Sequence, residues 1–327
     1  MAKIKWGILG PGVIAHKFAQ ALLTLEDAEL WAVGSRDFLR AQEFAQAYAM
    51  PKAYGSYEAL VEDPQVDIIY IATPHMFHRE GMIQCLNAGK AVLCEKSFTM
   101  NAREAREVVD LARKKKLFLM EAMWTRFLPA IRKLREWLEQ GVIGDIHLLK
   151  ADFGISREGG PHNRLLDPAL GGGALLDVGI YPVSFSSMVF GKQPEVLKSL
   201  VNIGPTGVDQ QCTMLFGYDE GRMASLSAAI ETEMMHDAWL YGTQGYIHIP
   251  NFFRAQKASL YLKDGKTEDF GPDFASTGYQ YEAQEAMECL RKGQLESKII
   301  PLDETISILE TMDKLREQWK LKYPGEI

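Results

Sequence analysis

The sequence predicts an α/β protein with an N-terminal, doubly wound parallel sheet of the Rossmann type and a C-terminal α+β domain with an open, mainly antiparallel sheet. Over roughly the first 120 residues, short apolar runs alternate with amphipathic stretches of helical length, which is the pattern of βαβ units. A glycine-rich turn follows the first apolar run, and after about Trp124 the rhythm changes to two-residue alternation. Because 327 residues exceed the roughly 100–200 of one typical domain, we expect a first domain over residues 1–123 and a second over 124–327.

The first domain is expected to alternate strands and helices throughout. The apolar runs predict strands at Ile4–Leu9, Glu29–Gly34, Ile68–Ala72, Ala91–Cys94 and Leu117–Met120. The helical patterns between them are Val13–Leu23, Leu39–Tyr48, Tyr57–Val61, Phe77–Ala88 and Ala102–Lys115. Asn101 is placed to cap the start of the last helix, and Gly89 to end the one before it, so both boundaries are chemically marked.

The second domain is expected to mix helices with longer alternating strands. A helical pattern runs from Pro129 to Gln140 and ends at Gly141. Two alternating runs, Thr213–Phe216 and Met223–Ile230, are separated by the turn Gly217–Gly221, which predicts a hairpin. Two further helical patterns close the chain, at Tyr281–Lys292 and Glu304–Leu321.

The composition argues against nucleic-acid and membrane partners. The net charge of −7 and the pI of about 5.6 argue against a surface that attracts nucleic acid or anionic lipid. Arg113–Lys116 form a local basic patch, which we interpret as a solvated helix end. No apolar run is expected to approach the roughly 20 residues of a membrane span, and the N-terminus enters a strand pattern without a signal-like segment. The 4 cysteines form no C-x-x-C pair, which argues against a disulfide framework and a zinc module. We expect a cytoplasmic protein.

A dinucleotide-binding motif, G-x-G-x-x-A, lies between the first strand and the first helix. Gly10 makes the tight turn, Gly12 lets the backbone approach a pyrophosphate, and Ala15 lets the helix pack closely. Val13 and Ile14 open the helix whose N-terminus attracts phosphate. The alternative is a plain glycine-rich turn, but the strand and the helix around the motif favour a dinucleotide site.

The end of the second strand favours NADP over NAD. An acid at this place binds the ribose 2′-hydroxyl of NAD, whereas an arginine accepts the 2′-phosphate of NADP. Ser35 and Arg36 stand at the strand end, and Arg40 lies four residues on, on the same helical face. Asp37 leaves NAD as an alternative if it turns inward, or it simply caps the next helix.

Two further strands end in polar residues at the edge where open α/β sheets bind ligands. Thr73, Pro74, His75 and His78 follow one of these strands and are expected beside the cofactor. A metal site made of the two histidines and Cys94 is disfavoured, because the spacing matches no common zinc module, and we expect no metal.

Glu95 and Lys96 end the next strand at the same edge. The ammonium of Lys96 is suited to hydrogen-bond a substrate hydroxyl and to favour the phenolate of a neighbouring tyrosine. The alternative is an ordinary surface lysine.

An acid and a phenol lie four residues apart after three glycines. Gly171–Gly173 allow a close approach of backbone or cofactor, and Asp177 and Tyr181 then share one face of an expected helix. Tyr181 is therefore the candidate for moving a proton, with Asp177 orienting Lys96 or the substrate. The alternative for Asp177 is an acid that interacts with the helix dipole.

Further candidates for the substrate pocket are the polar and aromatic side chains near these motifs: Trp124, Arg126, Phe153, His162, Asn163 and Arg164. Trp124 and Arg126 are also expected near the cofactor. Aromatic residues such as Phe153 and Tyr279 are, as an alternative, plain core or interface residues.

Together these motifs resemble the Gfo/Idh/MocA family of nicotinamide-dependent oxidoreductases over nearly the whole chain. The segments that carry the resemblance are Gly10–Ala15, Thr73–His75, Glu95–Lys96 and Gly171–Pro182. The resemblance implies a Rossmann domain joined to an α+β domain whose open sheet often forms oligomer contacts. Many members have Glu-Lys-Pro where this chain has Glu-Lys-Ser, a difference that removes a rigid turn and keeps the lysine.

Tyr181 indicates a narrower branch, because many family members have histidine at that place. Tyrosine there resembles the dimeric dihydrodiol dehydrogenases, which use NADP and also oxidise D-xylose. The resemblance to this branch is continuous over Ala91–Lys96, Met120–Phe127 and Gly172–Tyr181. It implies that Lys96 and Tyr181 are the catalytic pair and that Arg36 and Arg40 hold the 2′-phosphate. It also implies a homodimer formed through the C-terminal sheet.

We therefore expect NADP-dependent oxidation of a secondary hydroxyl, in an aldopyranose sugar such as D-xylose or in a vicinal diol, with Tyr181 as the base and Lys96 assisting it. Reduction of a keto-sugar or another carbonyl compound by the same groups is an alternative. A sensor that binds NADP without catalysis is a second alternative, and the presence of Lys96, Asp177 and Tyr181 together argues against it.

Overall fold

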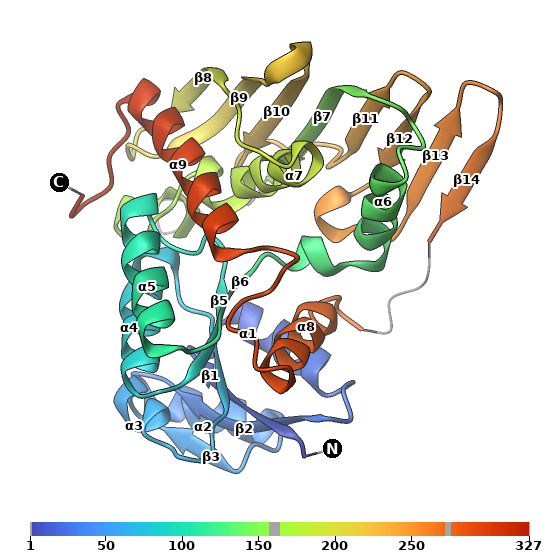
Figure 1. The fold of residues 1–327 in the computed structure, drawn as a ribbon. Coiled ribbons are helices and arrows are strands. Elements are labelled where there is room, and N and C mark those ends of the chain that lie inside the picture. Colours follow the sequence, from blue (N-terminus) through green and yellow to red (C-terminus); the bar gives the residue numbers. More distant parts are fainter. Residues whose placement is uncertain (1, 157–163, 272–275, 327) are drawn as a thin grey trace. The chain divides into compact units, whose positions relative to one another are not determined.

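The computed structural model describes residues 2–156, 164–271 and 276–326, which fold into two compact units (Figure 1). The first unit contains Met1–Trp124 and Phe274–Ile306, and the second contains Thr125–Asp273 and Ser307–Ile327. The chain thus returns to the first unit after the strands of the second, so that residues 274–306 belong with the N-terminal part.

The first unit is built on a parallel sheet of the Rossmann order β3-β2-β1-β4-β5-β6. Its strands are β1 (Ile4–Leu9), β2 (Ala28–Gly34), β3 (Lys52–Tyr54), β4 (Ile68–Ile71), β5 (Ala91–Glu95) and β6 (Leu119–Ala122). Its helices are α1 (Val13–Leu22), α2 (Phe38–Ala47), α3 (Tyr57–Val61), α4 (His78–Asn87), α5 (Ala102–Lys115) and α8 (Gln280–Arg291). In Figure 1, α4 and α5 lie together on one side of this sheet, and α1 packs against α8.

The predicted strands of the first unit are all present, with two differences. The edge strand β3 was not predicted, because three half-exposed residues leave no apolar run to detect. The last strand begins at Leu119 and not at Leu117. Lys116 ends α5 in the left-handed region at φ 55°, and the amide of Leu117 still bonds back to Ala112 O.

The second unit is built on an eight-stranded sheet of order β14-β13-β12-β11-β7-β10-β9-β8. Its strands are β7 (Ile146–Gly154), β8 (Val196–Ile203), β9 (Asp209–Gly217), β10 (Met223–Ala229), β11 (Ala238–Gly242), β12 (Gly245–Ile249), β13 (Ala258–Leu262) and β14 (Thr267–Phe270). Neighbouring strands pair antiparallel except β7 with β10. The predicted fold class, including the β9–β10 hairpin, is therefore confirmed.

Helices cover one face of the second sheet. They are α6 (Pro129–Glu139), α7 (Ile180–Phe190) and the C-terminal part of α9 (Leu302–Trp319) (Figure 1). Every residue of α7 from Ile180 to Ser187 is buried, which makes it the central helix of this unit.

The expectation that no segment has the length and hydropathy of a membrane span is wrong for one stretch. Pro168–Phe190 reaches a mean hydropathy of 1.4 over its most apolar window, and 89% of that window is buried inside the fold. Its alanine, leucine, isoleucine, valine and phenylalanine residues raise the hydropathy, and Asp177 is its one charged residue. Burial of this kind is the pattern of a core helix, which passes the same test of length and composition.

Candidate active site

The turn after β1 brings two glycines to the positive end of a helix, an arrangement that suits a pyrophosphate. Gly10 has φ 92°, and a Cβ atom built there would lie 3.1 Å from Thr73 Cγ2. Gly12 stands at the N-cap of α1 without a side chain to occupy the helix end. No acidic side chain is present in the first turn of α1, so its amides present an uncompensated positive end.

Thr73 borders this turn with an unsatisfied polar atom. Its Oγ1 is buried and has no hydrogen-bond partner within the part of the chain that the structure describes. A buried hydroxyl of this kind is costly unless a ligand or water bonds to it. The turn and the orphaned hydroxyl together fit a dinucleotide.

The carboxylate of Asp37 binds backbone amides at the start of α2. Its carboxylate is the N-cap of that helix and accepts from the amides of Leu39 at 3.0 Å and Arg40 at 3.4 Å. Ser35 Oγ in turn accepts from the Asp37 amide at 3.1 Å. Of the two alternatives that the sequence left open for Asp37, the structure contains the helix cap.

The two arginines beside Asp37 are exposed at the end of β2. The guanidinium of Arg36 lies 5.4 Å from the ring centroid of Phe77, a distance typical of a cation–π contact. Arg40 is exposed on the first turn of α2. Both cations are therefore accessible at the place where the ribose of a dinucleotide is expected.

His78 holds two loops of the sheet edge together and is not accessible to solvent. Its ring lies with Nδ1 2.8 Å from Ser97 O and Nε2 2.7 Å from Thr73 O. Burial lowers the pKa of His78 to about 4, so the neutral ring donates to one of these carbonyls only. His75 is also buried, edge-on to His78 with ring centroids 5.7 Å apart. Within the described ranges, no three His, Cys, Asp or Glu side chains are grouped so as to hold a metal ion.

Lys96 follows directly on the buried end of β5. Its side chain is half-buried, its amide donates to Glu95 Oε2 at 3.2 Å, and the Lys96–Ser97 peptide is cis. Glu95 also accepts a hydrogen bond from the hydroxyl of Tyr70, a fully buried residue of β4.

A second buried carboxyl group lies near Glu95 and was not anticipated from the sequence. Glu282 of α8 is fully buried, and neither of its oxygens has a hydrogen-bond partner among the residues with described positions. Burial and the charge of Glu95 raise the pKa of Glu282 well above its usual range. Only the fold brings α8 to this sheet, so no local pattern could have predicted this cluster.

Trp124 stacks on Tyr279 within the first unit. Their ring centroids are 4.5 Å apart and the planes differ by 4°. Trp124 was predicted as a pocket and cofactor residue, whereas Tyr279 was named only as a plain core or interface residue. Both side chains are largely buried and form one aromatic pair.

The segment with Asp177 and Tyr181 begins as a π-helix, and the prediction of an α-helix from its start is wrong. Leu175–Gly179 is π-helical, and α7 begins only at Ile180. Hydrogen bonds in a π-helix span five residues, so the four-residue spacing of one α-helical face does not apply across this turn. π-Helical turns are frequent at functional sites.

Asp177 is paired with Arg164 within the second unit. Arg164 Nη2 donates to Asp177 Oδ1 at 2.7 Å. The Asp177 side chain is only 9% exposed, so this charge-assisted bond satisfies a carboxylate that is nearly buried. Two other predicted pocket residues, His162 and Asn163, lie outside the described residues.

Tyr181 is surrounded by aromatic rings of the second unit. Its centroid lies 5.1 Å from Phe153 and 5.8 Å from Phe253, both in edge-on orientation. Phe153 and Phe253 stack at 4.1 Å, and His236 lies edge-on to Phe153 at 4.9 Å. Phe153 was predicted for this site. His236 lies in a loop and Phe253 in the short 3-10 helix Phe252–Arg254. Neither belongs to a sequence motif, and both were missed.

Arg126 anchors α7 and is almost completely buried. It is 2% exposed, and its guanidinium donates to Ser184 Oγ at 3.1 Å and to Ser184 O at 2.7 Å. Ser184 lies three residues after Tyr181, so Arg126 holds the helix that carries the phenol. A direct role of Arg126 at the cofactor stays a prediction.

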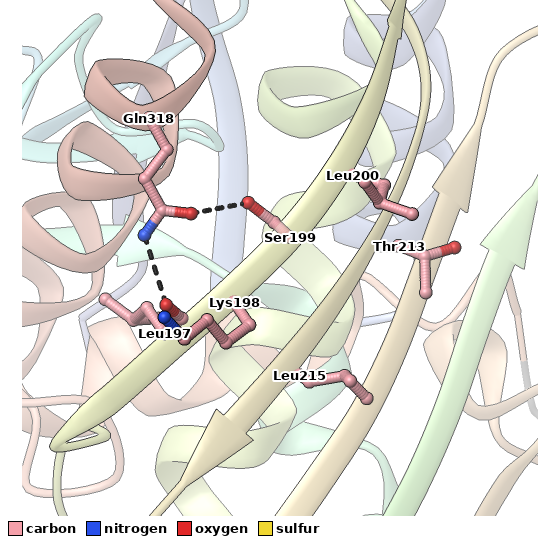
Figure 2. Close-up of a pocket in the computed structure, with 7 residues that line it drawn as sticks. All are labelled: Leu197, Lys198, Ser199, Leu200, Thr213, Leu215 and Gln318. Atoms are coloured by element: carbon pink, nitrogen blue, oxygen red, sulfur yellow. Dashed lines mark hydrogen bonds between the residues drawn. The ribbon is translucent and has the colours of Figure 1, made fainter.

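A surface groove lies at the edge strand β8 of the second unit (Figure 2). It is lined by Leu197, Lys198, Ser199, Leu200, Thr213, Leu215 and Gln318. Gln318 bonds to Ser199 Oγ at 2.8 Å and to Leu197 O at 3.2 Å. None of the predicted catalytic or cofactor residues lines this groove.

Family models match most of the chain. Residues 4–123 match a model described as the oxidoreductase family with an NAD-binding Rossmann fold. Residues 131–248 match the GFO/IDH/MocA C-terminal domain.

Curated relatives match over the full length. The chain is 41% identical to the mouse and to the human trans-1,2-dihydrobenzene-1,2-diol dehydrogenase, with 99% of each chain covered. Among solved structures, a 3-ketoreductase from Actinomadura kijaniata, in complex with NADP and TDP-benzene, superposes with a TM-score of 0.85 at 25% identity, covering 96% of this chain and 97% of that one. An aldose-aldose oxidoreductase from Caulobacter crescentus shares the fold, with a TM-score of 0.88 at 21% identity over 97% and 98% of the two chains.

Proposed function

The chain belongs to the Gfo/Idh/MocA family of oxidoreductases, and from this membership we propose that it oxidises a secondary hydroxyl of a trans-dihydrodiol or an aldopyranose sugar such as D-xylose, with NADP as the cofactor. The observation that carries the proposal is the retention of Lys96 at the end of β5 and Tyr181 in an aromatic surround, in a chain 41% identical to dihydrodiol dehydrogenases over its whole length.

The preference for NADP is supported by the arrangement of the charged side chains that follow β2. Asp37 is occupied as the cap of α2, which removes the acid that would bind a free 2′-hydroxyl. Arg36 and Arg40 remain exposed beside it and would hold the 2′-phosphate. Gly10, Gly12 and Thr73 would hold the pyrophosphate at the N-terminus of α1.

The preference for a ring-shaped alcohol is supported by the surround of Tyr181. Phe153, Phe253 and His236 form an aromatic wall beside the phenol. Aromatic faces suit a cyclohexadiene diol and also the apolar face of a pyranose ring. The relatives named as dihydrodiol dehydrogenases support the first of these substrate classes.

In the mechanism that we propose, Tyr181 Oη accepts the proton of the substrate hydroxyl. A free tyrosine has a pKa of about 10, so the phenol needs a cation beside it to act as a base near neutral pH. The Lys96 ammonium supplies that cation and donates to the same hydroxyl oxygen. Bound NADP supplies the hydride acceptor. Asp177, paired with Arg164, fixes the segment that precedes Tyr181.

The same residues serve reduction of a keto-sugar in the reverse direction. Tyr181 would then donate its proton to the carbonyl oxygen, as microscopic reversibility requires. Similarity to a 3-ketoreductase that binds a nucleotide ligand supports this second candidate.

We also propose a homodimer formed through the outer face of the C-terminal sheet. Leu200, Leu215 and Met223 are 80%, 55% and 54% exposed on this face. Three aromatic residues lie on the same sheet with ring centroids at most 6.3 Å apart: Trp239, Tyr241 and Tyr246. Exposed apolar area of this extent, continuing into the groove of Figure 2, is typical of an interface.

The test is the appearance of reduced nicotinamide with NADP or NAD and a panel of trans-dihydrodiols, aldopentoses and aldohexoses. We expect turnover with NADP that falls about 10²–10⁴-fold in Tyr181→Phe. Tyr54→Phe is the matched control, because Tyr54 lies on β3 and this change removes a phenol oxygen that bonds to Asp63. Tight NADP binding without turnover of any substrate in either direction would overturn the proposal in favour of a sensor.

A further inference from the structure

Two residues from distant parts of the second unit hold the glycine loop before the π-helix. Tyr323, which follows α9, donates its hydroxyl proton to Gly172 O at 2.6 Å. Asp209, the first residue of β9, accepts from the amide of Leu175 with Oδ2 at 2.6 Å. Asp209 is fully buried and Tyr323 is 3% exposed. Each therefore bonds to the backbone at one end of the four-residue segment Gly172–Leu175, which leads into the helix of Tyr181.

The loop backbone is pressed against these two side chains. Gly173 has φ 119°, and a Cβ atom there would lie 2.2 Å from Asp209 Oδ1 and 2.8 Å from Tyr323 Oη. The amide of Gly173 also donates to Leu165 O at 2.8 Å. The glycine thus has no room to shift toward Asp209 or Tyr323, and its conformation is one that other residues rarely adopt.

Counting protons links the two side chains to each other. Tyr323 has one hydroxyl proton, and Gly172 receives it, so Asp209 Oδ1 has no donor among the residues that the structure describes. Burial raises the pKa of Asp209 to about 7 and that of Tyr323 well above its usual range. A proton on Asp209 Oδ1 would be donated to Tyr323 Oη, giving a continuous chain from Asp209 through Tyr323 to Gly172.

Tyr323 is itself held by an ion pair between Arg316 of α9 and Glu326. Arg316 is 5% exposed and donates to both carboxylate oxygens of Glu326, at 3.0 and 2.9 Å. Glu326 accepts from the amide of Tyr323 at 3.0 Å, and the Arg316 guanidinium lies 5.3 Å from the ring of Tyr323. The phenol is therefore held rigidly enough to define the position of the loop.

We propose that Tyr323 and Asp209 are positioning residues for the reaction, because they fix the glycine loop and hence the orientation of Tyr181. This role rests on the proposed function of Tyr181 as the proton-transfer group. The alternative is a purely structural contact that contributes to stability and leaves the geometry of Tyr181 unchanged.

Tyr323→Phe removes a single oxygen atom and tests the role directly. We expect kcat to fall about tenfold or more, because small misplacements of reacting groups are costly, while the KM for NADP stays unchanged. Amide exchange in a peptide covering Gly171–Tyr181 should become faster. Tyr54→Phe deletes a comparable hydroxyl on β3 and should change neither kcat nor exchange in that peptide.

Two variants of Asp209 with similar volume test the hydrogen bonds, because Asn can still form them and Leu cannot. In Asp209→Asn, the amide oxygen accepts from Leu175 and the NH₂ group donates to Tyr323, so both kcat and exchange should stay close to the wild type. In Asp209→Leu both bonds are lost, and kcat and exchange should change as in Tyr323→Phe.

The exchange measurement keeps this inference separate from the proposed function. If the wild-type chain turns over none of the substrates, the role of Tyr181 fails, while faster exchange in Tyr323→Phe still shows that Tyr323 positions the loop. Unchanged exchange and unchanged kcat in Tyr323→Phe would overturn the inference. The inference would be supported if kcat falls in Tyr323→Phe and in Asp209→Leu but not in Asp209→Asn.

Discussion

Arg164 donates from Nη2 to Oδ1 of Asp177 at 2.7 Å, and this bond joins a partly exposed cation to a nearly buried carboxylate. The two residues are 13 apart in sequence, on either side of the glycine loop. Asp177 therefore does more than interact with a helix end, since its charge has a specific partner. The pair connects the loop before the glycines to the π-helical turn that precedes Tyr181.

Breaking this pair is expected to destabilise the second unit. In Arg164→Met, the nearly buried carboxylate of Asp177 loses its bond to Arg164, and we expect a loss of about 1–3 kcal/mol in the free energy of unfolding. Unfolding in urea measures this change in the free energy of unfolding. Asp177→Asn in the same background should recover part of the loss, because the amide is easier to bury. A double-mutant cycle with no coupling between positions 164 and 177 would contradict this prediction.

Glu282 is expected to make the protein less stable as the pH rises. Its pKa is raised well above its usual range in the folded state, whereas the unfolded chain ionises near 4.5. Above that pH the unfolded state releases a proton that the folded state retains, so stability falls by about 1.4 kcal/mol per pH unit until the pH passes the folded pKa. Glu282→Gln is permanently neutral and should be more stable than the wild type at pH 8, with a smaller difference at pH 5.

The matched control for Glu282 is Glu107→Gln. Arg79 lowers the pKa of Glu107, which is the opposite direction, and the two side chains are 34% and 49% exposed. Surface pairs contribute little, so this variant should follow the wild-type dependence of stability on pH closely. Equal pH dependence of wild type and Glu282→Gln would show that Glu282 is ionised in the folded protein.

The cofactor preference is expected to depend on Arg36 and Arg40 and not on Asp37. Replacing both arginines with alanine should raise the KM for NADP by about 10–100-fold, because each contributes a charge-assisted contact to the 2′-phosphate, with little change for NAD. Asp37→Ala should lower stability by about 1 kcal/mol through loss of the α2 cap and leave the ratio of the two cofactors unchanged. Steady-state kinetics with each cofactor decides between these outcomes, and a large change of preference in Asp37→Ala would place its carboxylate at the ribose instead.

The local sequence pattern was sufficient to predict the main elements of the fold and the residues at the ends of its strands. Periodicity and turn residues predicted the βαβ units and the hairpin, because in these elements burial follows sequence order. The three-residue β3 and the π-helical turn were missed, since neither has a periodicity of its own. Phe253 and Asp209 reach the segment of Tyr181 only through the pairing of the large sheet. Contacts of that kind leave no mark in a single sequence.

The outer face of the C-terminal sheet is expected to hold two chains together, and Leu200 is the residue that tests it most cleanly. It is 80% exposed on the edge strand β8, so an acidic replacement has room in the monomer and should leave its fold intact. Two such charges brought to an apolar interface would weaken association by several kcal/mol, because a buried charge without a partner is costly. We therefore expect Leu200→Asp to sediment as a monomer at a concentration where the wild type is a dimer. Leu23→Asp is the control, because Leu23 is 64% exposed and belongs to the first unit and not to this sheet, so its variant should remain dimeric. If Leu200→Asp and the wild type sediment alike, the edge of this sheet at β8 is not part of the interface.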